Sequence, residues 1–112
     1  MLGATRAKFA AIGKDLRILY VNEACSKVWE RRPEDVIGMH VKEILGTKNF
    51  ENSLDKFTEA ISGKTVDFEA EFTVGLRTFV LAIRLAPFYG TDQDSADQGE
   101  PQGVYALSLI HI

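Results

Sequence analysis

Two neighbouring stretches decide the fold of this chain, and they read Tyr20-Val21-Asn22-Glu23-Ala24 and Arg32-Pro33-Glu34-Asp35-Val36-Ile37-Gly38. The first passes from strand-forming residues directly into Asn22, a residue type that caps helices by accepting hydrogen bonds from free backbone N–H groups. The apolar residues between positions 24 and 29 share one helical stripe, and Pro33 stops that helix or starts the next turn. The two stretches therefore predict a strand, a short helix and a further helical turn in succession.

A hairpin is expected before this segment and a long helix after it. Residues 8–12 form a short apolar run, and a turn-forming cluster at 13–15 separates this run from the strand-forming residues 17–21. Residues 49–62 show the clearest helical spacing in the sequence, and Gly63 is well placed to end that helix.

Three strands are expected in the C-terminal half. Residues 66–74 alternate between apolar and polar side chains, as in a strand with one buried face. Residues 76–88 are almost continuously apolar, as in a central strand covered on both faces, but Arg77 and Arg84 have opposite parity and require a bulge or a partner. Residues 104–112 close with another strand. Two strands, several helices and three further strands indicate an α+β fold with an antiparallel sheet.

Composition predicts one soluble domain over residues 1–112. The chain is 46% hydrophobic and 26% charged, with a net charge of -3, and therefore lacks the basic surface of a nucleic-acid-binding protein. Residues 90–102 hold four acidic side chains and no basic ones, and the sequence predicts a flexible acidic surface loop there.

Cysteine usage and hydropathy favour a cytoplasmic location. A lone Cys25 excludes an internal disulfide framework and a cysteine-based zinc site. No apolar run approaches the roughly 20 residues that span a bilayer, and charged residues interrupt the N-terminal segment, so no direct membrane contact is expected. A sensor segment cut from a membrane-anchored parent would have the same appearance.

In this order, these segments resemble the PAS domain, a sensory module of bacterial and archaeal signalling proteins. The resemblance covers almost the whole chain and rests on the two quoted stretches, on Ala86-Pro87 before a polar loop, and on Gly103 at the start of the last strand. Glu30 stands where the family often has Gly, and His111 where Asp is common. The resemblance implies a five-stranded antiparallel sheet in the order 2-1-5-4-3, with helices packed on one face.

The resemblance also implies a ligand cavity between the long helix and the sheet. The candidate ligand-binding residues are the helical stripe and two strand aromatics, with two polar groups near the mouth: Phe50, Leu54, Phe57, Ile61, Phe68, Phe72, His40 and Arg84. A filled core is the alternative for each apolar member. Arg84 lies among apolar neighbours and must find a partner, which is either a carboxylate ligand or Glu69 or Glu71 on an adjacent strand.

Haem and flavin are not expected as cofactors. Haem needs an axial ligand such as His, which haem-binding relatives place on the long helix, and residues 49–62 contain none. The light-sensing flavin branch of the family uses a Cys in an Asn-Cys-Arg-like motif, whereas Cys25 lies in Glu-Ala-Cys-Ser. No cluster with metal-ligand spacing and no catalytic residues stand out, so the segment is not expected to be an enzyme.

The sequence therefore predicts a PAS sensory domain of a larger signal-transduction protein, either a histidine kinase or a cyclic-dinucleotide enzyme. It would bind a small molecule or a partner and signal to an effector domain through a homodimer, for which apolar residues on the outer sheet face are suited. A first alternative is a ligand-free dimerisation and transmission module. A second is a small cone-shaped α+β enzyme, which needs an inward titrating pair that the sequence does not offer at obvious positions.

Overall fold

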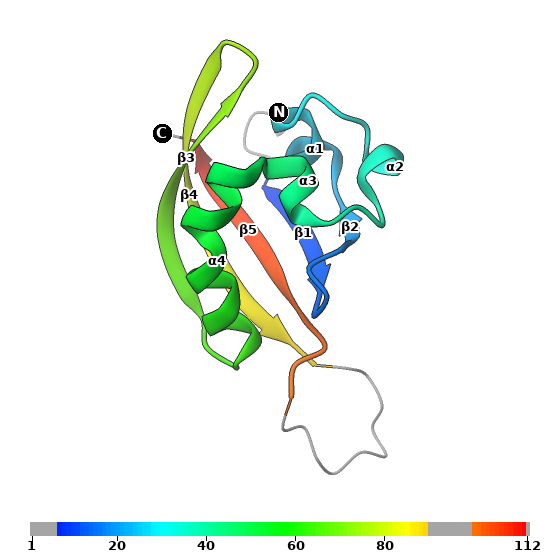
Figure 1. Ribbon diagram of the computed structural model, residues 1–112, viewed down its shortest axis with the longest axis vertical. Coiled ribbons are helices and arrows are strands. Elements are labelled where there is room, and N and C mark those ends of the chain that lie inside the picture. The colour runs from blue at the N-terminus through cyan, green and yellow to red at the C-terminus, as the bar shows by residue number, and fades with distance from the viewer. Residues whose placement is uncertain (1–6, 90–99, 112) are drawn as a thin grey trace.

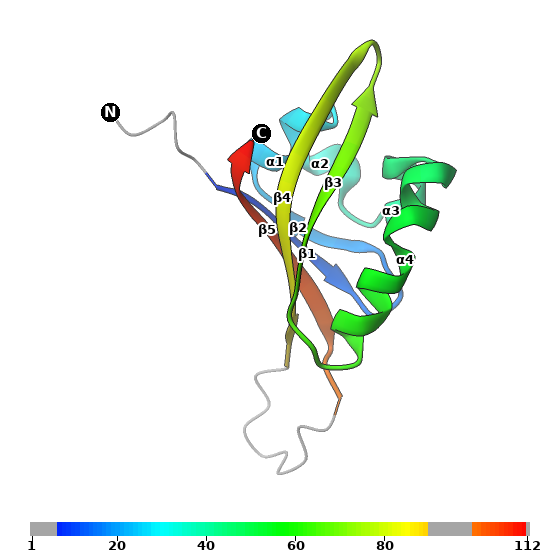
Figure 2. The ribbon, with the colours of Figure 1, turned by 90° about the vertical axis from the view of Figure 1, so that its left-hand side faces the viewer.

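Five antiparallel strands form one sheet in the order β2-β1-β5-β4-β3, and the helices cover one of its faces (Figures 1 and 2). This computed structural model describes residues 7–89 and 100–111. The elements are β1 Lys8–Gly13, β2 Ile18–Val21, α1 Glu23–Val28, α2 Pro33–Val36, α3 Val41–Leu45, α4 Thr47–Ile61, β3 Val66–Val74, β4 Arg77–Phe88 and β5 Gly103–His111. The predicted fold class and strand order are confirmed.

The last strand lies at the centre of the sheet. β5 pairs with β1 on one side, where Ala10 faces Ala106, and with β4 on the other, where Leu85 also faces Ala106. β4 lies between β5 and β3 and is paired along both edges, so residues 76–88 contain the expected interior strand.

The register of β4 against β5 shifts between Ala82 and Arg84, where β5 contains the extra residue, while β4 stays in regular register with β3. Arg77 and Arg84 therefore remain on opposite faces of β4, and each has a partner. Arg84 pairs with Asp67, and Arg77 lies 5.0 Å from the ring centroid of Phe79.

Helix α4 packs against β3, β4 and β5 through a narrower surface than its apolar stripe predicts. Its buried residues are Ser53, Phe57 and Ala60, whereas Leu54 is 40% exposed. Small Ser53 and Ala60 side chains let the helix axis approach the sheet closely, and this turns Leu54 outwards. The Ser53 hydroxyl donates to the Asn49 carbonyl oxygen at 3.0 Å, so burial of this polar group leaves no unpaired donor.

Asn22 joins the start of α1 to the start of β1. Its Oδ1 accepts hydrogen bonds from the backbone N–H of Cys25 at 3.0 Å and from that of Phe9 at 3.1 Å. Its Nδ2 donates to the Ala7 carbonyl oxygen at 2.8 Å. Asn22 is thus the predicted helix cap, and it also anchors a strand that is distant in sequence.

The end of α1 explains why Gly is frequent at position 30 in the family that this chain resembles. Glu30 has a φ of 57°, its N–H donates to the Lys27 carbonyl, and the N–H of Arg31 donates to the Ser26 carbonyl. These two bonds and the left-handed residue form a Schellman motif, in which Gly avoids the steric penalty of a Cβ.

We expect Glu30→Gly to raise the free energy of unfolding by about 0.5–1 kcal/mol, because it removes the cost of left-handed backbone at this position. Urea denaturation followed by Trp29 fluorescence measures the change. Glu34→Gly serves as the control, since Glu34 lies within α2 and Gly there lowers stability. A Glu30→Gly protein that is no more stable than the parent would contradict this expectation.

Most of the predicted acidic loop 90–102 lies outside the described residues. Within its described part, the Glu100 carboxylate lies 3.4 Å from the Lys14 ammonium. In the described segments, no helix combines the length and the apolar character needed to cross a membrane.

Candidate functional site

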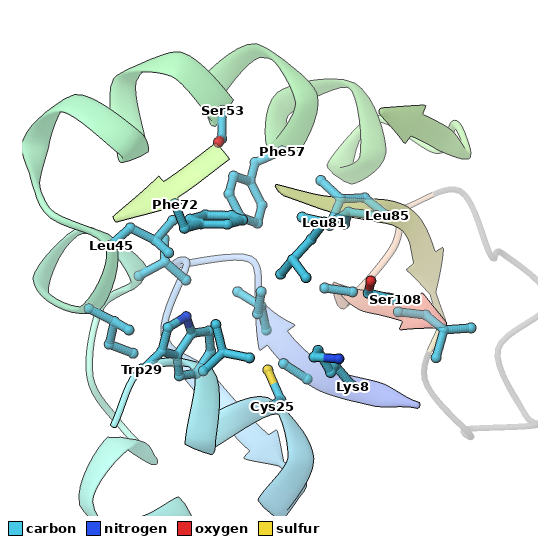
Figure 3. Close-up of a pocket in the computed structure, with 18 of the residues that line it drawn as sticks. Lys8, Cys25, Trp29, Leu45, Ser53, Phe57, Phe72, Leu81, Leu85 and Ser108 are labelled. Atoms are coloured by element: carbon cyan, nitrogen blue, oxygen red, sulfur yellow. The ribbon is translucent and has the colours of Figure 1, made fainter. Parts of the chain in front are cut away.

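A cavity of about 80 Å³ lies between the inner face of the sheet and the helices (Figure 3). Almost all of its wall is apolar, and it is lined by Lys8, Ala10, Ile12, Ile18, Cys25, Val28, Trp29, Val41, Ile44, Leu45, Ser53, Phe57, Phe68, Phe72, Leu81, Ile83, Leu85, Ala106, Leu107 and Ser108. The strands contribute the floor, α4 contributes Ser53 and Phe57, and the α1 segment contributes Cys25, Val28 and Trp29.

Three of the eight predicted ligand-binding residues line the cavity, namely Phe57, Phe68 and Phe72. Phe50 and Ile61 are half-buried and pack against the core beside the cavity, and Leu54 faces solvent. The reason is that α4 turns Ser53, Phe57 and Ala60 towards the sheet, so that Phe57 alone of the predicted stripe is fully buried.

His40 does not line the cavity and instead caps α3. Its Nδ1 accepts a hydrogen bond from the Lys42 N–H at 3.0 Å, and its own backbone N–H donates to the Glu43 carboxylate at 3.1 Å. Its ring contacts Phe50 edge-on, with 5.5 Å between the ring centroids. These contacts give His40 a structural role, because they cap α3 and hold the imidazole ring against Phe50.

Arg84 lies on the outer face of the sheet, away from the cavity. Its Nε donates to Asp67 Oδ1 at 2.8 Å and its Nη2 donates to Asp67 Oδ2 at 3.1 Å. The predicted partners, Glu69 and Glu71, are wrong, because the register of β3 against β4 places Asp67 directly opposite Arg84. The hydrogen bonds from Arg84 lower the pKa of Asp67, but both side chains are exposed, so solvent screens this pair.

Cys25 is a cavity residue whose surroundings suppress its reactivity. Burial raises the pKa of its thiol to about 12, and the nearby charge of Lys8 opposes that shift only in part. The thiol therefore stays protonated at neutral pH, and a protonated thiol is a poor nucleophile and a poor metal ligand. Its role in the wall is that of a small apolar side chain.

The predicted site residues did not include Lys8, the one charged side chain that the described part of the chain contributes to the lining, nor the lining residues of the α1 segment. Lys8 has the same strand parity as Ala10 and Ile12, both of which point into the core, so the β1 alternation is the signal that could have identified it. Lys8 is half-buried, and none of the ion pairs among residues 7–89 and 100–111 involves it.

A polar surface groove of about 500 Å³ meets the cavity between α4 and β3. Ser53, Phe68 and Phe72 line both spaces, and therefore separate the cavity from the surface. The groove is otherwise formed by polar side chains of α4 and by the edge strand β3.

The opposite face of the sheet carries a row of aromatic side chains across three strands. Phe9 on β1 lies between Tyr20 on β2 and Tyr105 on β5, with ring-centroid distances of 5.9 and 6.0 Å. Tyr20 is 51% exposed. Within the described part of the chain, no group of three or more His, Cys, Asp or Glu side chains is arranged to hold a metal ion.

Several solved structures share this architecture. The PAS domain of the histidine kinase ThkA is 20% identical, with a TM-score of 0.66 over 94% of this chain and 100% of that domain. VqmA of Vibrio cholerae, in a complex with ligand and DNA, is 16% identical, with a TM-score of 0.77 over 92% of this chain and 45% of VqmA. A PAS domain from Colwellia psychrerythraea is 12% identical, with a TM-score of 0.73 over 91% of this chain and 83% of that one.

At these identities the likeness concerns the fold. No curated protein matches the sequence. A family model described as the PAS fold matches residues 2–109, which is nearly the whole chain. The sheet order, the helices on one face and this match agree, and the chain therefore belongs to the PAS family.

Proposed function

We propose that this PAS domain is the sensory input of a larger signal-transduction protein, and that the signal is a small molecule bound in the cavity. The observation that carries the proposal is the cavity itself. Protein interiors are close-packed, and 80 Å³ is several times the space that a single water occupies. The likeness to the ThkA domain supports a histidine kinase as the parent protein, ahead of a cyclic-dinucleotide enzyme.

A ligand in the cavity would contact β5, the strand that also carries part of the aromatic row on the opposite face of the sheet. The central strand β5 contributes Ala106 and Ser108 to the cavity and Tyr105 to the aromatic row on the opposite face. A ligand shifts the population between two arrangements of the domain only by its difference in affinity for them. We propose that β5 couples the occupied cavity to a homodimer packed through the aromatic row. A single free thiol, at the half-buried Cys25, is consistent with a cytoplasmic domain.

The proposal predicts that filling the cavity abolishes ligand binding. Ala106→Leu adds three carbon atoms to the cavity wall, and we expect it to remove the thermal stabilisation that the parent domain shows with its ligands. The measurement is a thermal-shift screen of small apolar and amphipathic metabolites, followed by native mass spectrometry of the hits.

The matched control is Ala82→Leu, which adds the same atoms beside a shallow hollow on the outer face and leaves the cavity lining unchanged. We expect it to bind as the parent does. An Ala106→Leu domain that folds and binds the same ligands with undiminished affinity contradicts a site in the cavity.

The aromatic row favours a second candidate, a dimerisation and transmission module that needs no ligand. Phe9, Tyr20 and Tyr105 form a partly exposed apolar surface of the kind that marks protein–protein contacts. Sedimentation velocity discriminates between the two functions. A dimer that forms without any bound mass, and whose stability no compound in the screen alters, supports the second candidate.

A further inference from the structure

We propose that the ligand is a small monocarboxylate with a short apolar chain, and that Lys8 binds its carboxylate. This inference rests on the proposed function and narrows it to a chemical class. It follows from one charged side chain in an otherwise apolar cavity, and from the volume of that cavity.

The position of Lys8 is the first argument. Lys8 lies on the inner face of β1, opposite Ser108 on β5, and Figure 3 shows it beside Cys25 at one end of the cavity. The nearby thiol of Cys25 is protonated and carries no compensating charge. A half-buried ammonium without a carboxylate partner among the described residues is costly, and a ligand anion would supply the missing charge and acceptor.

The other lysines near the cavity are less suited to this role. Lys56 already lies 3.4 Å from Asp55 and 5.6 Å from the ring centroid of Phe68. Lys48 and Lys56 share the outer groove with Glu69 and Glu71, whose negative charges reduce its attraction for an anion. Among the described residues, Lys8 is the lysine that lines the cavity. We therefore place the carboxylate of the ligand at the end of the cavity where Lys8 lies.

The remaining lining defines the rest of the ligand. Around the centre of the cavity, the wall consists of aliphatic and aromatic side chains such as Trp29, Phe57, Phe72 and Leu81. Apart from the indole N–H of Trp29, these side chains offer no hydrogen-bonding group, so the wall favours an apolar ligand chain. A cavity of 80 Å³ is about half the size of one that encloses benzene, so the apolar chain that it encloses beyond the carboxylate has about three carbon atoms.

Titration calorimetry with butyrate and its neutral isostere butyramide tests this proposal. We expect the parent domain to bind butyrate about tenfold more tightly than butyramide, because a charge-assisted hydrogen bond is stronger than a neutral one. From acetate to butyrate, affinity should rise about fourfold per methylene group, and it should fall for longer acids that exceed the cavity.

Lys8→Met keeps the length of the side chain and removes its charge, so it should eliminate the preference for butyrate over butyramide. Lys64→Met is the matched control, because Lys64 is exposed after α4 and does not line the cavity, and it should retain the preference. Lys8→Arg retains the charge and should also retain the preference, which provides a second readout if Lys8→Met folds poorly.

Equal binding of butyrate and butyramide by the parent domain overturns this proposal, as does unchanged butyrate binding by Lys8→Met. The proposed sensory function would still hold after either result if the screen finds other compounds that bind the parent domain but not the Ala106→Leu variant. If no compound of the wider screen binds, both proposals fail. The two failures are therefore distinguishable.

Discussion

Replacing Gly103 with alanine is expected to destabilise the domain by about 3 kcal/mol or more, because β1 and β5 leave no space for a side chain at this position. A Cβ at Gly103 would collide with the carbonyl oxygen of Ile12 and lie 2.9 Å from two ring carbons of Phe88. Ile12 belongs to β1, which pairs with β5 along its length, so its carbonyl cannot move without disrupting that ladder. Total stabilities of about 5–15 kcal/mol are typical of domains, and a loss of this size removes a large share.

Gly13→Ala is the matched control, because Gly13 lies directly opposite Gly103 in the same ladder. A Cβ at Gly13 would meet Asp15 Oδ1 at 3.0 Å, and this is a side-chain atom at an exposed turn that can shift. We expect a cost below about 1 kcal/mol. Urea denaturation measures both variants, and similar midpoints for the two would contradict the proposed close approach of β1 and β5.

Asn22→Ala is expected to lower the free energy of unfolding by about 2–3 kcal/mol, an effect second in size to that of Gly103→Ala. The substitution removes the helix cap of α1, worth about 1 kcal/mol, and two further hydrogen bonds, to Phe9 and Ala7, of similar value. Because these bonds connect α1 to β1, the variant should also show faster amide hydrogen exchange at Phe9 and Cys25 than the parent domain.

Asn22→Asp separates the two roles of the side chain. Aspartate keeps both accepted hydrogen bonds, from Cys25 and Phe9, but it cannot donate to the Ala7 carbonyl oxygen. Its stability should therefore lie between those of the parent and Asn22→Ala. Equal stability of the aspartate and alanine variants would show that capping contributes little at this position.

The sequence predicted the elements well because local rules govern them. The alternation over 66–74 and the helix after Gly46 follow from side-chain periodicity, which neighbouring residues determine. The rotation of α4 was not predictable in this way. Apolar spacing indicated Phe50, Leu54, Phe57 and Ile61, whereas the contact with the sheet selected Ser53 and Ala60 for their small size.

The candidate site was only partly predictable, for a related reason. Phe57, Phe68 and Phe72, which were expected between the long helix and the strand over 66–74, all line the cavity, because helical and strand periodicity place them on the inward sides of their elements. The partner of Arg84 depends on strand register, and a shift of two residues in the register of β3 exchanges Asp67 for Glu69. Cys25 and Lys8 belong to elements that only the folded chain brings to the same cavity as α4.

By itself the sequence determined which segments become helices and strands, where Asn22 caps α1, and that the chain forms an α+β sheet protein, since these depend on local propensity and periodicity. Only the tertiary structure decided that an 80 Å³ space remains and that Lys8 lines it. A cavity is the difference between the volume that the elements enclose and the volume that their side chains fill. That difference is set jointly by residues far apart in the chain, so no local pattern contains it.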